Sequence, residues 1–316
     1  MKKKRTQERI GSIELAKGPA LCPGVPRGLG ILILALLLPI LACETGHPLA
    51  KESANLTEDF AGNRALRIDG YNEANSVLRL IYRKLPETTL YCQCSFDPNS
   101  KYSSGSCPFR PRDSSDQRER HKVHWEHIVP ASRLGKSRTC WQDAICHRKD
   151  GKPYGGRSCC RKKDRLFRAM ESDLHNLRPA IGEINRHRQD YNFGDISGER
   201  REYGPCDMEI SSENDLAEPP ESARGPIARS YLYMESAYGI RLTAAERSQY
   251  IKWHRKYPPE APEIARDLLI RELQGNSNPY IHGYDQTNLL DSRSKNPDKE
   301  GHSAEPPPNP GSCLLL

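Results

Sequence analysis

The stretch His124-Trp125-Glu126-His127-Ile128-Val129-Pro130-Ala131 sets a carboxylate beside an imidazole within a run of strand-forming residues. Glu supplies a hard oxygen ligand of the kind that Mg²⁺ prefers, and neutral His accepts a proton near neutral pH. The pattern predicts a strand over residues 123–129 that Pro130 ends. Consecutive strand residues point to opposite faces, so Glu126 and His127 can serve one site only if the strand ends or bulges there.

Charge is distributed unevenly along the chain. Of the formal net charge of +7 over 316 residues, residues 1–43 contribute +5, from seven Lys or Arg against two Glu. Residues 108–168 contain 17 Lys or Arg against 7 Asp or Glu, a local +10. This distribution excludes a uniformly basic nucleic-acid-binding surface. A basic segment around Glu126 and His127 suits a phosphate-bearing polyanion, and a solvated basic loop is the alternative interpretation.

The N-terminal 43 residues are interpreted as an export signal, because a basic start leads into the apolar run 30–43, which is short for a bilayer span and interrupted by Pro39. Two kinds of processing stay open: ordinary cleavage near Ala42, or lipoprotein maturation, in which a lipidated Cys43 attaches the chain to the membrane. We expect a polar linker over 44–60, one folded domain over 61–284 and a disordered tail over 285–316.

Eight of the 11 cysteines fall inside the expected domain: Cys92, Cys94, Cys107, Cys140, Cys146, Cys159, Cys160 and Cys206. An even number downstream of an export signal predicts disulfides formed in an oxidising compartment. The competing hypothesis is a zinc site, but zinc ligands are typically paired as C-x2-C, whereas the spacings here are C-x-C and C-C. The adjacent Cys159 and Cys160 are expected to bond to different partners, and the pairing is left open.

Helical periodicity and end signals dominate the rest of the domain. They predict helices at 74–85, 164–177, 181–188, 226–238, 243–257 and 262–274, with a loop at 97–120 and an irregular insertion at 135–160. The helix at 181–188 offers Asn185 as a second oxygen ligand for a metal, and a helix-surface or capping role is the alternative. Glu171 is interpreted either as a solvated helix residue or as a carboxylate behind the metal site.

Several ordered motifs together identify a family. They are Trp125-Glu126-His127-Ile128-Val129-Pro130-Ala131, Cys140-Trp141-Gln142-Asp143, Gly155-Gly156-Arg157, Met170-Glu171-Ser172-Asp173-Leu174-His175-Asn176-Leu177 and Gly182-Glu183-Ile184-Asn185. With further matches up to Gly275-Asn276-Ser277-Asn278-Pro279-Tyr280, the chain resembles the endonuclease I family of periplasmic and secreted bacterial nucleases. The resemblance implies an α+β, helix-rich, disulfide-stapled single domain with a ββα-metal (His-Me finger) site that cleaves DNA and RNA with little sequence preference.

The resemblance also implies roles for individual residues. Glu126 and Asn185 would bind one Mg²⁺, His127 would be the general base, Arg157 would contact the scissile phosphate or stabilise the product, and Glu171 would lie close to the metal. The protein would act as an exported monomer, in the periplasm or outside the cell. Between Asp143 and Gly155 this chain is longer than short members of the family, and the added residues are Cys146, His147, Arg148, Lys149 and Lys152.

Two other functions remain as alternatives. A binding module that kept the fold and lost catalysis would lack Glu126, His127 or Asn185, and all three are present. A zinc-dependent hydrolase would use the same histidines together with free cysteines as ligands.

Overall fold

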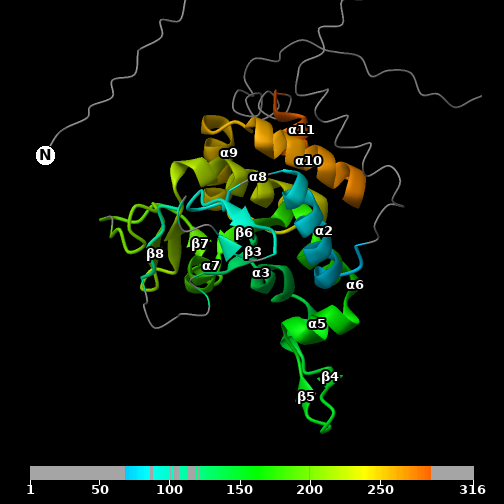
Figure 1. The fold of residues 1–316 in the computed structure, drawn as a ribbon. Helices are drawn as coiled ribbons and strands as arrows, with labels where there is room; N and C mark the ends of the chain where they lie inside the picture. The colour runs from blue at the N-terminus through cyan, green and yellow to red at the C-terminus, as the bar shows by residue number, and fades with distance from the viewer. Residues whose placement is uncertain are drawn as a thin grey trace, which may run out of the picture. The chain divides into compact units, whose positions relative to one another are not determined.

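The computed structural model of the protein describes residues 68–85, 88–99, 101–102, 105, 107–112, 119, 121–198 and 200–285. The predicted signal peptide and linker, the first residues of the predicted domain and nearly all of the predicted tail lie outside these ranges. Figure 1 shows helices grouped around short strands. The mixed, helix-rich α+β class predicted for the domain is therefore confirmed.

A two-stranded antiparallel sheet followed by a helix lies at the centre of the fold. Strand β3 (Val123–His127) pairs with β6 (Leu177–Ile181), with His127 opposite Leu177 and Val123 opposite Ile181, and helix α7 (Gly182–Arg188) follows β6 directly. Strand β3 was expected from the sequence, although it ends two residues earlier than predicted. Strand β6 was not, because a helix was predicted through residue 177.

The predicted helix 164–177 is wrong in its second half. Helix α6 (Arg165–Ser172) ends where Asp173 adopts an extended conformation, and the Asp173 side chain accepts a hydrogen bond from the backbone N–H of His175, which opens the 3₁₀ turn η2 (Leu174–Asn176). The next residues form β6, all five of which are buried. A strand buried on both faces has no alternating pattern, so its apolar residues were read as a continuation of the helical face.

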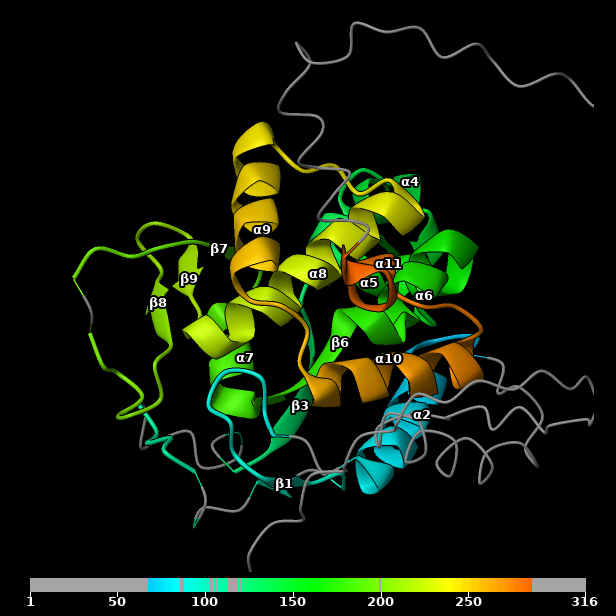
Figure 2. The same ribbon diagram turned by 90° about the horizontal axis from the view of Figure 1, so that it is seen from above.

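Two apolar cores flank the central sheet. One lies between α2 (Tyr71–Lys84), α10 (Ala261–Gln274) and Trp125, with Leu78 and Ile270 fully buried. Figures 1 and 2 both place α10 beside α2. The other and larger core includes α8 (Glu221–Tyr238), which packs against α9 (Ala244–Lys256). The sheet is thereby largely buried: all five residues of β6 and the last three of β3 are shielded from solvent.

The remaining elements are short: β1 (Phe96–Asp97), β2 (Lys101–Tyr102), α3 (Ala131–Gly135), α4 (Thr139–Gln142), β4 (Cys146–His147), β5 (Pro153–Tyr154), α5 (Arg157–Lys163), β7 (Asn192–Phe193), β8 (Glu209–Ser211), β9 (Leu216–Glu218) and α11 (Pro279–His282). Strands β4 and β5 form an antiparallel hairpin inside the segment that was expected to be irregular. Strand β9 pairs with β7 in parallel and with β8 antiparallel.

The helices after residue 220 follow their sequence signals closely. Thr243 and Glu246 form a capping box at the start of α9, and Gly275, with φ of 90°, ends α10 in the left-handed conformation that glycine adopts without strain. Helix α8 begins five residues earlier than expected and contains Pro226 near its start. Within the part of the chain that the structure describes, no helix is long and apolar enough to cross a membrane.

All eight cysteines of the domain are paired. The disulfides are Cys92–Cys206, Cys94–Cys107, Cys140–Cys160 and Cys146–Cys159. The predicted disulfide framework is confirmed, and the adjacent Cys159 and Cys160 do bond to different partners. Because no cysteine of the domain is left as a thiolate, the zinc hydrolase alternative loses its cysteine ligands.

Candidate active site

Glu126 lies on the face of β3 that α7 covers. Its side chain is 2% exposed, and its Oε1 accepts hydrogen bonds from the Tyr91 hydroxyl at 2.9 Å and from Arg188 Nη1 at 3.1 Å. Burial raises the pKa of Glu126, while the charge of Arg188 and the hydrogen bond from Tyr91 act in the opposite direction. Since both of these hydrogen bonds end on Oε1, the second carboxylate oxygen remains for a further ligand.

Arg188, the last residue of α7, holds the end of β3 in place. Besides its ion pair with Glu126, it donates to the backbone carbonyl oxygens of His127 and Ile128, both at 2.9 Å. The guanidinium also stacks on Phe193, with its central carbon 4.4 Å from the ring centroid. This fully buried guanidinium joins one carboxylate and two backbone carbonyls of the β3 end to the last residue of α7, so helix and strand are fixed relative to each other.

His127 is the last residue of β3 and points to the opposite face, toward α2. Its ring stacks on Tyr71 with centroids 5.3 Å apart, and its Nε2 donates to the backbone carbonyl of Glu171 at 2.9 Å. A carbonyl can only accept, so Nε2 carries the proton and Nδ1 keeps its lone pair. Burial, reinforced by the positive charge of Arg157, lowers the pKa of His127 to about 4. The ring is therefore neutral at pH 7, with a nitrogen able to accept a proton.

Two arginines from α5 meet the carboxylate of Glu171. Arg157 Nε donates to Oε1 and Arg161 Nε donates to Oε2, the latter at 2.7 Å. Burial raises the pKa of Glu171, but the hydrogen bonds from Arg161 and Arg157 outweigh it and the pKa is lowered. The carboxylate is 1% exposed while the arginines are about 40% exposed, so their terminal nitrogens reach solvent beside His127.

Tyr71 at the start of α2 joins His127 to these arginines. Its ring lies 5.9 Å from the guanidinium carbon of Arg157 and 5.3 Å from that of Arg161. Cations within about 6 Å of an aromatic face are attracted by the ring quadrupole. One tyrosine therefore contacts both the imidazole and the two positive charges.

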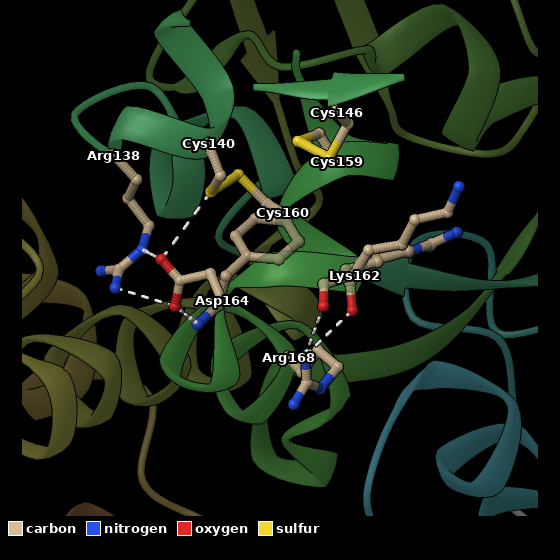
Figure 3. Close-up of a disulfide and its surroundings, with 10 residues drawn as sticks. Arg138, Cys140, Cys146, Cys159, Cys160, Lys162, Asp164 and Arg168 are labelled. Atoms are coloured by element: carbon tan, nitrogen blue, oxygen red, sulfur yellow. Dashed lines mark hydrogen bonds and ion pairs between the residues drawn. A yellow bond between two sulfur atoms is a disulfide. The ribbon is translucent and has the colours of Figure 1, made fainter. Parts of the chain in front are cut away.

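Helix α5 is itself held by covalent bonds. Figure 3 shows its Cys159 and Cys160 in two neighbouring disulfides, to Cys146 of β4 and Cys140 of α4. At its C-terminal end Asp164 accepts hydrogen bonds from the Arg138 side chain and from the backbone N–H of Phe167. The positions of the α5 arginines thus depend on cross-links in addition to packing.

Beyond His127 the chain is guided by a side chain instead of a strand partner. The side-chain amide of Asn176 accepts a hydrogen bond from the backbone N–H of Val129 at 2.8 Å and donates one to the Val129 carbonyl at 3.0 Å. The backbone carbonyl of Asn176 accepts from the backbone N–H of Ile128 at 3.0 Å. This clamp replaces the regular ladder immediately after His127. The strand ends at His127, earlier than predicted and without a bulge, so Glu126 and His127 stay on opposite faces at the strand end.

Asn185 lies half-buried in the last turns of α7, and its carbonyl accepts a hydrogen bond from the backbone N–H of Gln189. It precedes Arg188 by three residues, and residues with this spacing share one side of a helix. Arg188 contacts Glu126, so the spacing allows Asn185 to approach the same region, and the described contact of Asn185 itself is the one to Gln189. The described contacts of Glu171, by contrast, join it to His127 and the α5 arginines rather than to Glu126 or Asn185.

The oxygen donors of this region suit a magnesium ion better than a zinc ion. Over the described residues, no three His, Cys, Asp or Glu side chains gather as they would around a protein-enclosed metal. Mg²⁺ keeps several water ligands and needs only one or two protein oxygens. The second oxygen of Glu126 and the amide oxygen of Asn185 are donors of that kind.

Comparison with known proteins decides the family. The sequence profile of the endonuclease I family matches residues 71–284, which is more than half of the chain. The chain belongs to the endonuclease I family.

Similar proteins with assigned names agree with this membership. An extracellular deoxyribonuclease of Aeromonas hydrophila is 38% identical over 218 residues, which cover 68% of this chain and 88% of that protein. A periplasmic deoxyribonuclease of the same species is 39% identical over 205 residues, 64% of this chain and 80% of the relative. An Endonuclease-1 of Buchnera aphidicola is 35% identical over 218 residues, 68% and 81% of the two chains. The enzyme class predicted from the sequence, an endonuclease, is thereby confirmed.

Within this endonuclease I domain the structure also shows residues that sequence reasoning missed. Tyr71, Tyr91, Arg161 and Arg188 contact His127, Glu126 or Glu171, and none was predicted. For Arg161 the sequence held a usable signal, because it follows Arg157 by four residues and so shares its helix face. For the two tyrosines and Arg188 no local signal existed, since their partners are distant in sequence.

Proposed function

We propose that the protein is an exported endonuclease that hydrolyses phosphodiester bonds of DNA and RNA with little sequence preference, using one Mg²⁺ held by Glu126 and Asn185. The observation that carries the proposal is the state of His127, a neutral imidazole whose Nε2–H is held by the Glu171 carbonyl and whose ring stacks on Tyr71, which also contacts the two arginines of α5. The names of the deoxyribonuclease relatives support DNA as a substrate.

In this mechanism His127 acts as general base. Its Nδ1 takes a proton from water, the water oxygen bonds to phosphorus, and the bond from phosphorus to the 3′ oxygen breaks, with the leaving oxygen taking a proton from solvent. The products carry 5′-phosphate and 3′-hydroxyl ends. Arg157 contributes positive charge next to the phosphate that changes its bonding. When bound, Mg²⁺ would neutralise charge on the phosphate and on the departing oxygen.

Glu171 has a supporting task in this proposal. Its carbonyl selects the tautomer of His127, and its carboxylate sets the directions of Arg157 and Arg161. With each Nε engaged, the terminal nitrogens of both guanidiniums remain for phosphate oxygens. Contacts of this kind go to the backbone of the nucleic acid and carry no base information, which agrees with cleavage at many sequences.

We also propose that the protein works outside the cytosol, in the periplasm or beyond the cell. The four disulfides require an oxidising compartment, and the names of the similar proteins refer to extracellular and periplasmic enzymes. We expect a monomer, freed by cleavage near Ala42 or attached to the membrane through a lipidated Cys43.

The proposal is tested with the purified, oxidised protein and supercoiled plasmid. We expect nicking that EDTA stops and added Mg²⁺ restores. His127→Ala should lower the turnover rate by roughly 10²- to 10⁴-fold, the usual contribution of a general base, and leave the Mg²⁺ concentration for half-maximal activity unchanged. Nicking by His127→Ala at the parent rate would show that another group is the base, and a parent protein inactive with every added metal would refute the proposed function.

A further inference from the structure

The hairpin β4–β5 is the part of the domain that extends furthest from the central sheet. Figure 1 shows it projecting beyond α5, at the end of the fold opposite to α9 and α10. Residues 147–153 are all exposed, and the turn is closed by hydrogen bonds from Arg148 N to Lys152 O at 2.9 Å and from Gly151 N to Arg148 O at 3.0 Å. Gly151 has φ of 82°, which favours glycine at this turn.

The exposed side chains of the hairpin are mainly cationic. Arg148, Lys149 and Lys152 stand around the turn with a single carboxylate, Asp150, which lies 3.5 Å from the Lys152 ammonium. The Lys152 side chain is 77% exposed and that of Asp150 is 53% exposed. At such exposure the pair contributes little to stability, so these charges are not explained by a structural task.

The hairpin is firmly joined to the helix that carries the site arginines. The Cys146–Cys159 disulfide connects β4 to α5, and Tyr154 of β5 precedes Arg157 by three residues. Lys162 of α5 lies 5.2 Å from the centroid of the Tyr154 ring, and Arg148 approaches the same ring at 5.5 Å. Positive charge therefore continues from the hairpin turn to α5 on a cross-linked frame, which differs from a freely moving basic loop.

We infer that the β4–β5 hairpin is a phosphate-binding arm that holds the nucleic-acid strand to one side of the bond being cleaved. The inference rests on the proposed function and extends its substrate contact beyond His127. Strand β4 has two residues, and the turn begins at Arg148, so the chain from Cys146 to the turn spans about 7 Å. Phosphates follow one another at about 3.4 Å of helix axis along each strand, so an arm of this length passes about two of them.

The chemistry of the surface favours a polyanion over a protein partner. Charged residues, lysine above all, are depleted at the centre of protein interfaces, whereas here they occupy the turn itself. The exposed large apolar residue nearby is Ile145, 44% exposed, and a single such residue does not form a patch. Exposed lysine ammonium groups on a disulfide-bonded hairpin can contact phosphates, whose spacing is regular and does not depend on the base sequence.

The test compares two double variants of equal charge change. The hairpin variant carries Lys149→Gln and Lys152→Gln and so loses two exposed cations of the hairpin. The control variant carries Lys252→Gln and Arg271→Gln and loses two exposed cations of α9 and α10, at the opposite end of the fold. Binding of a fluorescent 30-base-pair duplex is measured in EDTA, without cleavage, between 50 and 200 mM salt. Melting temperatures of all three proteins show that each variant is folded.

We expect the hairpin variant to lose affinity and salt dependence together. Each phosphate contact adds about 0.9 to the steepness with which the logarithm of the binding constant falls with the logarithm of the salt concentration, and it raises affinity roughly five-fold at 0.15 M salt. The loss of two contacts should therefore raise Kd on the order of 25-fold and lower this slope by about 2. The control variant should change both quantities far less. With Mg²⁺ restored, the hairpin variant should lose more kcat/KM on the duplex than on a tetranucleotide, which is too short to reach the turn.

The outcomes separate the two proposals. If the parent binds duplex but does not cleave it, the proposed function fails while the arm is still judged by the binding data. If the hairpin variant matches the control variant in Kd and slope, the arm is refuted. A second result would also refute the phosphate-binding arm: both double variants bind duplex like the parent, and only the hairpin variant loses binding to vesicles that contain an anionic phospholipid. The hairpin cations would then bind a membrane surface.

Discussion

Substituting Glu171 by Gln isolates the task of one buried carboxylate. The change keeps the backbone carbonyl that holds His127 but removes the charge that Arg157 and Arg161 share. Arg157 and Arg161 donate to different oxygens of Glu171, and Gln replaces one of these oxygens with an NH₂ group, so one of the two Nε groups loses its acceptor. Hydrogen bonds to charged groups contribute about 1.5–3 kcal/mol when buried, and because both arginines are about 40% exposed we take the lower part of that range. A loss of about 2 kcal/mol in placing Arg157 corresponds to about 30-fold in kcat/KM.

A double-mutant cycle with Arg157→Gln tests whether Glu171 acts through that arginine. If it does, the double variant should be no slower than the slower single variant, because the second change removes a partner that is already lost. The readouts are kcat/KM for plasmid nicking, the Mg²⁺ concentration at half-maximal activity and the melting temperature. We expect the Mg²⁺ requirement of Glu171→Gln to equal that of the parent.

Two results would refute this reasoning. Additive losses in the cycle would mean that Glu171 and Arg157 act separately. A several-fold higher Mg²⁺ requirement in Glu171→Gln would mean that its carboxylate supports the metal, as the family resemblance implies. His127 keeps its carbonyl partner in this variant, so a loss of base function would not account for either result.

Two further predictions concern the metal and the pH dependence of stability. Asn185→Ala should raise the Mg²⁺ concentration for half-maximal activity about ten-fold or more. The melting temperature should change little, because the side chain is half-buried at the surface of α7. An unchanged Mg²⁺ titration would exclude Asn185 as a ligand. The hydrogen bond from Arg133 lowers the pKa of Glu246 from 4.5 to about 2. A carboxyl with a depressed folded-state pKa stabilises the fold above its unfolded pKa and loses that contribution as pH falls through the folded value. Glu246→Gln should therefore lower the melting temperature at pH 7, and this effect should diminish as the pH falls from 4.5 to 2. An equal loss of melting temperature at pH 7 and at pH 2 would contradict a stabilising ion pair between Glu246 and Arg133.

Local sequence signals were sufficient where a residue's partner is nearby in the chain. Helices α9 and α10 begin and end within one residue of the predicted bounds, and the structure shows a capping box of Thr243 and Glu246 at the start of α9 and Gly275 at the end of α10. The same kind of signal failed at β6, where Leu177 continues the apolar spacing of α6 although the chain has already turned at Asp173. Local spacing records which residues are apolar, and it cannot distinguish a helix face from a strand that is buried on both sides.

At the candidate site, too, some features follow from the local sequence and others only from the tertiary structure. The amino-acid sequence by itself supplied the candidate pair Glu126 and His127, the basic segment around it and the eight cysteines, since these depend on residue type and near spacing. Only the tertiary structure decided that His127 faces Tyr71 and Glu171 while Glu126 faces Arg188, and which cysteines pair. These contacts join residues up to 114 positions apart, as in Cys92–Cys206. Local periodicity carries no information at that range, because such pairs form only when whole elements pack together.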